Sequence, residues 1–425
     1  MKVLLISANR TEINMRTMPL GLAFVAQALS DRGHGVKLID CVGLDDVESH
    51  IQKALAAFMP DVIGISIRNI DDQTMVNTRF LYLDDRDIIA FVRSVSDRPI
   101  ILGGAGYSMF PDAILADCDA DMGIEGEGEA ALCMVLEKLG NREPLDGIPG
   151  LHIKGRPGAR KRELIRDTEN FPLPDLRYII GPAVTPDTWV PVQTRRGCAM
   201  DCSYCSTASI EGRTLRKRPI APVVAWLDRL VKAGAGQLYF VDNTFNLPPS
   251  YALSLCRAIT DAGLQLKWRC IVYPWRIDEQ LVAAMAAAGC FEISLGSESA
   301  DDEALRLMHK RFRREDVVRA FGLFKKYGIM QMGFLMLGAP GDTRKSVEDT
   351  LAFAGSLDYD MLKVTVGIRI YPNTSLADEA RRQGIIKADD NLLEPRFYIT
   401  PDLDEIWIRE MAAKYAAKHP NWIVG

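Results

Sequence analysis

The stretch "VPVQTRRGCAMDCSYCS", residues 190–206, places three cysteines within eight positions, directly after a strand-like segment. Cys198, Cys202 and Cys205 are spaced C-x3-C-x2-C, and no fourth cysteine lies nearby. This spacing is too compact for three core cysteines on one strand or helix, so it predicts a loop that holds an inorganic group. Structural zinc sites and ferredoxin-type clusters take four protein ligands. Three cysteines instead suit a [4Fe–4S] cluster whose remaining iron stays open for a substrate or cofactor.

The other six cysteines are scattered, mostly in apolar segments. A zinc site completed by one of them is the alternative to a cluster. Cys256, Cys270 and Cys290 lie in or directly before helix-like and strand-like segments, where core packing is expected. The role of Cys41, after a strand end, stays open. An odd number of scattered cysteines argues against a secreted disulfide scaffold and favours a reducing, cytoplasmic location.

Six strand-like segments, each followed by a helical stretch, make up residues 189–390, and the cysteine loop follows the first of them. Six such units are too few for an eightfold barrel and predict a partial (β/α)6 barrel with its chemistry at the carboxyl ends of the strands. The remaining tail, residues 391–425, predicts one amphipathic helix. The strand-like segments span residues 190–196, 237–243, 266–273, 291–298, 330–338 and 362–372.

The cysteine loop, with Tyr204 before its last cysteine, resembles the radical S-adenosylmethionine enzymes, and the resemblance extends from about residue 190 to residue 390. It implies that the amino and carboxylate groups of S-adenosylmethionine occupy the open iron. The reduced cluster would then cleave the sulfonium to a 5′-deoxyadenosyl radical. A low-potential electron donor such as flavodoxin or ferredoxin is implied as a partner.

Three further segments carry this resemblance. "YFVDNTFN" resembles the family's second-strand segment, which lies beside the methionine amino group, and "EISLGSESADDEALRLMHK" resembles the fourth-strand run near the ribose or methionine groups. "MGFLMLGAPGDTRKSVEDTL" resembles the glycine–proline turn where the backbone approaches adenosine. The S-adenosylmethionine contacts implied in this way are Asp242, Asn243, Thr244, Ser297, Glu298 and Gly338.

Residues 1–140 contain five alternating strand-like and helix-like units, which predict a doubly wound, Rossmann-like parallel sheet. Ligands of such sheets bind at the carboxyl ends of the strands, where Ser and Gly collect in this sequence. The stretch "GEGEAAL" also offers backbone N–H groups at a helix start, which suit a phosphate. Residues 141–188 are rich in Pro, Gly and charge and predict a linker.

The segments "PDVIGISI", "PIILGGAGYSMFPD" and "DMGIEGEGEAAL" resemble the cobalamin-binding domain that precedes the radical domain in one large branch of the family. No Asp-x-His-x-x-Gly motif is present, so a histidine ligand to cobalt is not expected. Arg68 either approaches the lower face of the corrin or pairs with Asp71 or Asp72. The residues implied at the cobalamin site are Ser7, Ser66, Arg68, Gly103, Gly104, Gly126 and Glu127.

Charged and aromatic residues within the predicted barrel leave two alternatives open. Arg269 and Arg369 sit inside strands, where a buried charge needs a carboxylate partner or an anionic ligand. The aromatic residues there either line a substrate cavity or pack the barrel. They are Tyr239, Trp268, Tyr273, Trp275 and Tyr371.

Composition excludes several other classes of function. The net charge of −5 and pI of about 5.7 give no footprint for nucleic acid. No apolar run reaches the roughly 18 residues of a membrane span, and the first residues become polar too soon for a signal peptide. The sequence therefore predicts a cytoplasmic protein without nucleic-acid or membrane partners.

The two resemblances together imply an enzyme that methylates an unactivated carbon of a small metabolite or natural-product precursor. The methyl group would come from methylcobalamin after the 5′-deoxyadenosyl radical has removed a hydrogen atom. Radical cyclisation, ring rearrangement or oxidation without methyl transfer is the alternative, and a corrinoid sensor or carrier is a more distant one. The sequence assigns no substrate-contacting catalytic residue.

Overall fold

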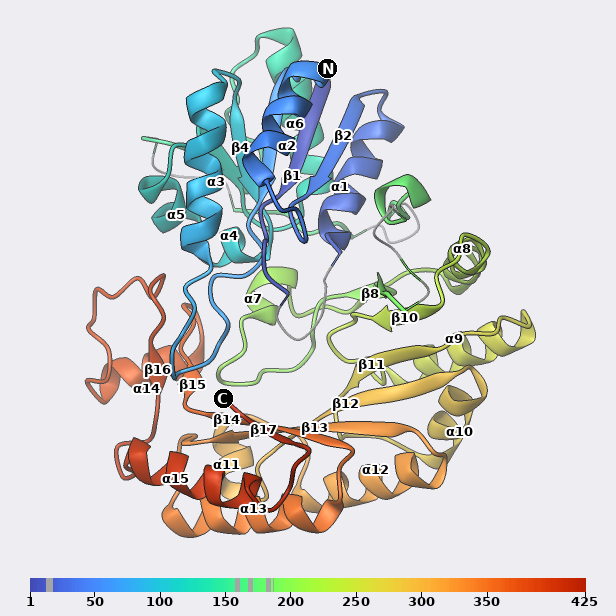
Figure 1. Cartoon of the computed structure of the whole chain (residues 1–425), viewed down its shortest axis with the longest axis vertical. Coiled ribbons are helices and arrows are strands. Elements are labelled where there is room, and N and C mark those ends of the chain that lie inside the picture. The colour runs from blue at the N-terminus through green and yellow to red at the C-terminus, as the bar shows by residue number, and fades with distance from the viewer. Residues whose placement is uncertain (13–17, 157–160, 167–170, 181–184, 186) are drawn as a thin grey trace. The chain divides into compact units, whose positions relative to one another are not determined.

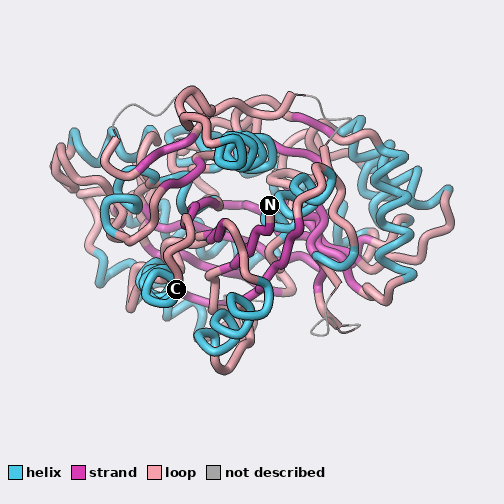
Figure 2. The backbone as a smooth tube through the Cα atoms, turned by 90° about the horizontal axis from the view of Figure 1, so that it is seen from above, coloured by secondary structure: helices cyan, strands magenta, loops and turns pink. Residues whose placement is uncertain are grey.

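The computed structural model describes residues 1–12, 18–156, 161–166, 171–180, 185 and 187–425. The chain forms two compact units, each an alternation of helices and strands (Figures 1 and 2). Unit 1 contains Met1–Asp72, Arg79–Val190 and Ser209–Gly212. Unit 2 contains Gln73–Thr78, Pro191–Ala208 and Arg213–Gly425.

A six-stranded sheet in the order β2-β1-β3-β4-β5-β6 forms the centre of unit 1. The first five strands are parallel, and β6 joins the edge antiparallel to β5. The central strands are apolar almost throughout because helices cover both faces, with α1 against α6 and α2 against α3. The predicted doubly wound sheet is confirmed. Its strands are β1 (Lys2–Ser7), β2 (Gly35–Asp40), β3 (Val62–Ser66), β4 (Ile100–Gly103), β5 (Met122–Ile124) and β6 (Leu151–Ile153).

The chain turns sharply after β4. Gly104 has a φ of +97°, and the short helix α4 follows it. The helices are α1 (Leu20–Asp31), α2 (Val47–Phe58), α3 (Tyr82–Val95), α4 (Ala105–Met109), α5 (Pro111–Asp117), α6 (Gly128–Asn141) and the 3-10 turn η1 (Leu176–Tyr178).

The stretch 141–188 was expected to be a linker with only short strand-like pieces such as "LHIKG", residues 151–155. This piece forms β6, which joins the sheet of unit 1. Within the same stretch, residues 157–160, 167–170, 181–184 and 186 lie outside the described residues.

Unit 2 is built on a seven-stranded sheet in the order β17-β14-β13-β12-β11-β10-β7. Its two edge strands, β7 and β17, do not pair with each other in the described part of the chain, so the sheet is an open barrel, as predicted. The seventh strand, β17, was not expected, because only a helix was predicted in the tail. The strands are β7 (Trp189–Val192), β10 (Gln237–Phe240), β11 (Trp268–Val272), β12 (Cys290–Glu298), β13 (Met330–Leu337), β14 (Met361–Val366) and β17 (Trp422–Val424).

Helices connect successive strands of this sheet, and neighbours such as α8 and α9, or α9 and α10, pack side by side. The remaining strands form two short antiparallel ladders, β8 (Arg195–Arg196) with β9 (Arg216–Lys217) and β15 (Ile368–Arg369) with β16 (Phe397–Tyr398). The helices are α7 (Thr207–Glu211), α8 (Ile220–Lys232), α9 (Pro249–Asp261), α10 (Glu279–Ala287), α11 (Asp302–Leu307), α12 (Arg314–Lys326), α13 (Arg344–Leu357), α14 (Ser375–Arg382) and α15 (Glu405–Ala416).

Candidate functional site

The cysteine loop begins directly after the short strand β8. Cys198 is buried, whereas Cys202 and Cys205 are half-buried, and the N–H of Cys205 donates to the carbonyl of Cys202 at 3.1 Å. Within the described ranges, no group of three or more His, Cys, Asp and Glu side chains is arranged to hold a metal. What fits an iron–sulfur cluster is the donor chemistry of the loop, which supplies three thiols and no fourth.

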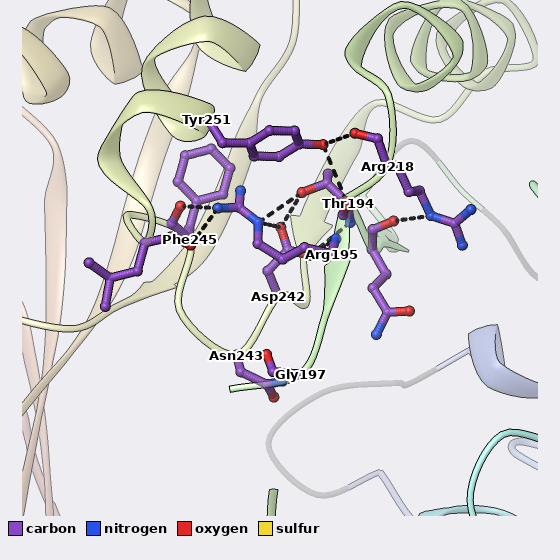
Figure 3. A network of polar contacts seen from close by, with 10 residues as sticks. Thr194, Arg195, Gly197, Arg218, Asp242, Asn243, Phe245 and Tyr251 are labelled. Atoms are coloured by element: carbon purple, nitrogen blue, oxygen red, sulfur yellow. Dashed lines mark hydrogen bonds and ion pairs between the residues drawn. The ribbon is translucent and has the colours of Figure 1, made fainter. Parts of the chain in front are cut away.

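A buried ion pair holds the chain that enters the cysteine loop (Figure 3). The Nε of Arg195 lies 3.3 Å from Oδ2 of Asp242, and the two side chains are 1% and 0% exposed. The Nη1 of Arg195 also donates to the carbonyls of Phe245 and Leu247, each at 2.9 Å. The guanidinium lies 4.6 Å from the ring centre of Tyr251. Since Cys198 follows three residues later, this network fixes the start of the loop.

Asp242 uses both carboxylate oxygens inside the protein. Oδ1 accepts from the backbone N–H groups of Thr194 and Arg195 at 2.7 and 3.0 Å, and Oδ2 accepts from the Thr194 hydroxyl at 2.6 Å. A direct contact with a methionine amino group would compete with these bonds. The two neighbouring residues that were predicted as contacts with Asp242 are placed as follows. Thr244 is buried, and the side-chain amide of Asn243 donates to the carbonyl of Gly197 at 3.4 Å.

A second buried charge pair lies beside the cysteines. The ammonium of Lys310 donates to Oε1 of Glu298 at 2.9 Å and to the hydroxyl of Tyr204 at 2.7 Å. The Tyr204 hydroxyl donates to the same Glu298 oxygen at 3.1 Å. The ammonium also lies over the rings of Tyr204, Tyr273 and Phe312, 4.9 to 6.0 Å from their centres. This cluster fixes Tyr204, one of the two residues between the second and third cysteines.

The electrostatics of this cluster follow from its burial. Burial alone would lower the pKa of Lys310, but Glu298, Tyr204 and Cys202 together raise that pKa well above its usual value. Burial raises the pKa of the Tyr204 hydroxyl, and the Glu298 charge raises it further. Lys310 therefore stays charged and Tyr204 stays protonated.

The sequence interpretation assigned no role to Lys310, although the quoted run "EISLGSESADDEALRLMHK" ends on it. The only sequence signal for this contact is the presence of a lysine twelve residues after Glu298. Sequence spacing does not show that these two side chains meet, because the helix α11 and a turn separate them. Glu298 itself has φ of +60° beside a bulge in the pairing of β12 with β13. Such a backbone is uncommon outside glycine and recurs at functional sites.

The other predicted contacts in unit 2 are also held by neighbours. Ser297 is buried, and its hydroxyl lies 2.6 Å from that of Tyr359. Gly338 adopts φ of +88° and donates its N–H to Asp342 at 3.0 Å, while its carbonyl accepts from the N–H of Thr400 at 3.0 Å. Burial raises the pKa of Asp342 to about 6, opposed by the hydrogen bonds that its carboxylate accepts. The turn at Gly338 is thus fixed by internal bonds.

The open alternatives for the charged barrel residues are settled as follows. Arg269 has a carboxylate partner, because its Nη1 lies 3.6 Å from Oε1 of Glu292. Arg369 donates to backbone carbonyls, including that of Leu392 at 2.9 Å, an arrangement that neither expectation included.

Among the aromatic residues and cysteines, core packing is confirmed at several positions. Trp268 is fully buried and donates its indole N–H to the carbonyl of Ala288 at 2.7 Å. Cys256, Cys270 and Cys290 are buried, as expected. Cys41 is buried too, and burial raises its pKa to about 12, which keeps it a thiol.

In unit 1, three of the predicted cobalamin residues lie side by side at the carboxyl ends of neighbouring strands. Ser7 at the end of β1 pairs in register with Ser66 of β3, and Ser66 pairs with Gly103 of β4. The strand order reverses between β1 and β3, and ligands of doubly wound sheets bind at such a reversal.

The two adjacent glycines differ in what they allow. A Cβ on Gly103 would meet no atom within 4 Å, so open space lies beside the end of β4. A Cβ on Gly104 would lie 2.3 Å from the carbonyl oxygen of Ile67, and its φ of +97° already favours glycine. Gly104 therefore serves the turn, and Gly103 borders the space that suits a ligand.

This difference makes Gly103 the better position for a substitution. Gly103→Val is expected to keep the thermal midpoint of the wild type while weakening cobalamin binding about tenfold or more, because the new side chain enters the open space. Gly104→Val is expected to lower the unfolding free energy by about 2 kcal/mol or more whether or not cobalamin is supplied. Thermal melts and retained cobalamin, measured on both variants, check the pair. Unchanged cobalamin binding by Gly103→Val would remove this edge from the site.

Of the remaining predicted residues of unit 1, Gly126 and Glu127 follow the end of β5, and Arg68 follows the end of β3. Gly126 adopts φ of +92° and donates its N–H to the Ser108 hydroxyl at 2.9 Å. Glu127 accepts from the N–H of Ile165 at 2.7 Å through Oε2, so its side chain holds a following segment of the chain. Arg68 is exposed two residues beyond Ser66. The open space beside Gly103 thus lies next to Ser66, its register partner on β3.

Comparison with known families agrees with both units. Residues 192–354 match the Radical SAM superfamily, and residues 6–136 match the B12 binding domain. The chain is a cobalamin-binding radical S-adenosylmethionine protein. This family uses a [4Fe–4S] cluster and S-adenosylmethionine beside cobalamin, and the three thiols of the cysteine loop are the donor chemistry that suits the cluster.

Relatives resemble this radical S-adenosylmethionine protein over most of its length. An uncharacterized methyltransferase of Pyrococcus horikoshii is 28% identical over 89% of this chain and 83% of its own. The tryptophan 2-C-methyltransferase of Streptomyces laurentii is 25% identical over 88% of this chain and 74% of its own. A methyltransferase structure from Kitasatospora setae, with cobalamin and a [4Fe–4S] cluster bound, has a TM-score of 0.88 at 23% identity over 100% of this chain and 93% of its own. This last likeness shows the shared fold.

No helix in the described ranges is both long and apolar enough to cross a bilayer.

Proposed function

We propose that this radical S-adenosylmethionine protein is a cobalamin-dependent methyltransferase that acts on an unactivated carbon of a small molecule. The observation that carries the proposal is a loop of three cysteines without a fourth, in one chain with a cobalamin-type sheet. The relatives described above are methyltransferases and align along most of the chain. When bound, the cluster and S-adenosylmethionine supply a radical, and cobalamin supplies the methyl group.

In unit 2, the residues of this chain bind and orient. Cys198, Cys202 and Cys205 hold the cluster through their thiolates. Glu298 and Lys310 form a charge pair that suits the zwitterionic end and the ribose of S-adenosylmethionine. The backbone turn at Gly338 borders the adenosine. Asn243, Thr244 and Ser297 complete the polar surroundings.

Asp242 has a different part in the proposal from the one expected from sequence. Both oxygens of the Asp242 carboxylate already interact with Thr194 and Arg195, so we assign Asp242 to the positioning of the cysteine loop. A buried pair of this kind excludes water from one side of the loop.

In unit 1, the proposed cobalamin site uses the sheet edge formed by Ser7, Ser66 and Gly103. The turn at Gly104 and the end of β5 at Gly126 border it. We also place Glu127 and Arg68 at its margin. A histidine ligand to cobalt is not proposed, since the sequence contains no Asp-x-His-x-x-Gly motif. His50 bonds to the backbone carbonyl of its own helix cap, Asp46, at 2.7 Å.

Two partners follow from the proposal. A radical reaction of this kind needs one electron from outside, so a low-potential donor such as flavodoxin or ferredoxin is required. The substrate is a small molecule, and tryptophan is the first candidate because a relative that aligns over 88% of this chain is a tryptophan 2-C-methyltransferase.

The proposal is tested with the full chain, reconstituted anaerobically with iron, sulfide and cobalamin. S-adenosylmethionine labelled in its methyl group is supplied with a reductant and a panel of small molecules that includes tryptophan. We expect labelled methyl groups in a product and none with Cys202→Ala. A product altered without label would instead establish cyclisation or oxidation.

Glu298→Gln tests the assignment of the charge pair. The amide still accepts from Lys310 but carries no charge, so we expect the iron content to persist while S-adenosylmethionine binding weakens about tenfold, the worth of one charge-assisted hydrogen bond. Equilibrium binding of S-adenosylmethionine to the reconstituted variant gives the result. Glu292→Gln, which alters the separate Arg269 pair, serves as the control. Wild-type binding by Glu298→Gln would remove this carboxylate from the site.

A further inference from the structure

Two exposed arginines converge on the ring of Trp275, just beyond the carboxyl end of β11. The guanidinium carbon of Arg276 lies 4.2 Å from the ring centre, and that of Arg311 lies 5.8 Å from it. Trp275 itself is half-buried. Neither arginine forms an ion pair with a carboxylate in the part of the chain that the structure describes. Two positive charges therefore meet at one aromatic ring without compensation.

The loop that carries Trp275 is held from below by a fully buried asparagine. The side-chain amide of Asn246 donates to the carbonyls of Tyr273 and Trp275 at 2.8 and 3.0 Å. Its oxygen accepts from the N–H of Tyr273 at 3.0 Å. Burying an amide is favourable only when its hydrogen bonds are made, and here three of them fix one loop. The position of Trp275 is thus set by the fold.

Arg276 is held in an uncommon backbone conformation. Its φ of +56° lies in the left-handed region, which costs free energy for a residue with a Cβ. Non-glycine residues in such conformations cluster at ligand-binding sites, where the surrounding structure keeps them in place. Here this conformation follows directly on the loop that Asn246 clamps.

The same loop touches the groups next to the cysteines. The Tyr273 hydroxyl accepts from the N–H of Arg311 at 2.8 Å, and its ring faces the ammonium of Lys310 at 5.7 Å. Lys310 in turn contacts Glu298 and Tyr204. A ligand at Trp275 would therefore lie next to the side chains assigned to the cluster and S-adenosylmethionine.

We infer that Arg276 and Arg311 bind an oxyanion group, a carboxylate or a phosphonate, of the small-molecule substrate. A guanidinium stacked on an aromatic ring uses its flat face, and the N–H donors on its edge remain available in the fork geometry that matches such oxyanions. The pair supplies charge, and the clamped Trp275 supplies an apolar surface beside it. That the bound molecule is the substrate rests on the proposed function.

The test uses the full chain with benzoate, phenylphosphonate and the neutral benzamide as probes. Calorimetric titration gives each affinity, and quenching of tryptophan fluorescence, compared with that of Trp275→Phe, locates the binding. We expect the wild type to prefer an anionic probe over benzamide by about tenfold or more. The preference is expected to disappear in Arg276→Gln and Arg311→Gln. It is expected to persist in Arg313→Gln, an exposed arginine of the same segment that does not contact the Trp275 ring.

Comparison of the two anions shows which oxyanion the site takes. The inference is overturned by equal binding of benzoate and benzamide, by a preference that survives both arginine substitutions, or by no saturable binding of either anion. Iron content, retained cobalamin and methyl transfer of the wild type are measured in parallel. If the wild type lacks iron, cobalamin and methyl transfer but still prefers the anionic probes, the proposed function is refuted and the anion site is retained.

Discussion

We expect replacement of Cys202 with alanine to abolish cluster assembly and S-adenosylmethionine cleavage, and we expect the same for Cys198 and Cys205. In the proposed site each thiolate is one of three protein ligands, so loss of one leaves two corners of the cluster without protein support. The expected iron content falls from about four per chain to near zero. Iron and acid-labile sulfide analysis after anaerobic reconstitution gives the result directly.

Cys256→Ala is the matched control, because Cys256 is fully buried in α9 and packs in the core. It is expected to keep its iron. A cluster of wild-type stoichiometry in the triple variant of the loop would show that other cysteines hold the metal. Loss of iron with Cys256→Ala would point the same way.

Arg195→Met is the second change with a large expected effect. It removes one partner of a pair whose side chains are almost completely buried and leaves the Asp242 carboxylate uncompensated. Breaking such a pair costs about 3–5 kcal/mol of unfolding free energy. Denaturant unfolding of the purified chain measures this cost. Iron content should fall as well, because the pair fixes the start of the cysteine loop.

The double variant Arg195→Met with Asp242→Leu separates the effect of an unpaired buried charge on stability from the effect of the pair on the position of the cysteine loop. Replacing both members of a buried pair with apolar side chains is close to neutral for stability. We expect the unfolding free energy to return toward that of the wild type, while iron content recovers only in part because the hydrogen bonds to Thr194 are absent. Full iron content in both variants would contradict the positioning role of the pair.

The cysteines and the strand ends were accessible from sequence because their signals are local. Cys198, Cys202 and Cys205 lie within eight positions, and apolar runs predict β1, β3 and β4 directly. Of the two short edge strands, β6 lies in "LHIKG", a strand-like piece of the expected linker, whereas β17 was not predicted because it is only three residues long and pairs with β14, far earlier in the chain.

Side-chain partners were less accessible than the motifs that contain them. The motif containing Asp242 predicted a polar strand end. It did not predict that the Asp242 carboxylate pairs with Arg195, which lies 47 positions earlier in the chain. In the same way, the sequence does not show the contacts of Lys310, because only the turn after α11 brings its ammonium to Glu298 and Tyr204. Gly104 shows a third case, since a glycine needed for a turn and one needed beside a ligand have the same sequence signal.

The most direct test of the central claim is the cofactor content of one anaerobically reconstituted sample of the wild type. Iron analysis and the visible spectrum of cobalamin are recorded together, with Cys202→Ala in parallel. We predict about four iron atoms and one cobalamin per wild-type chain, a spectrum without histidine ligation of cobalt, and a variant that keeps cobalamin but loses iron. A wild type that takes up the cluster but no corrinoid under reducing conditions would contradict the claim and leave a radical enzyme with an additional α/β unit.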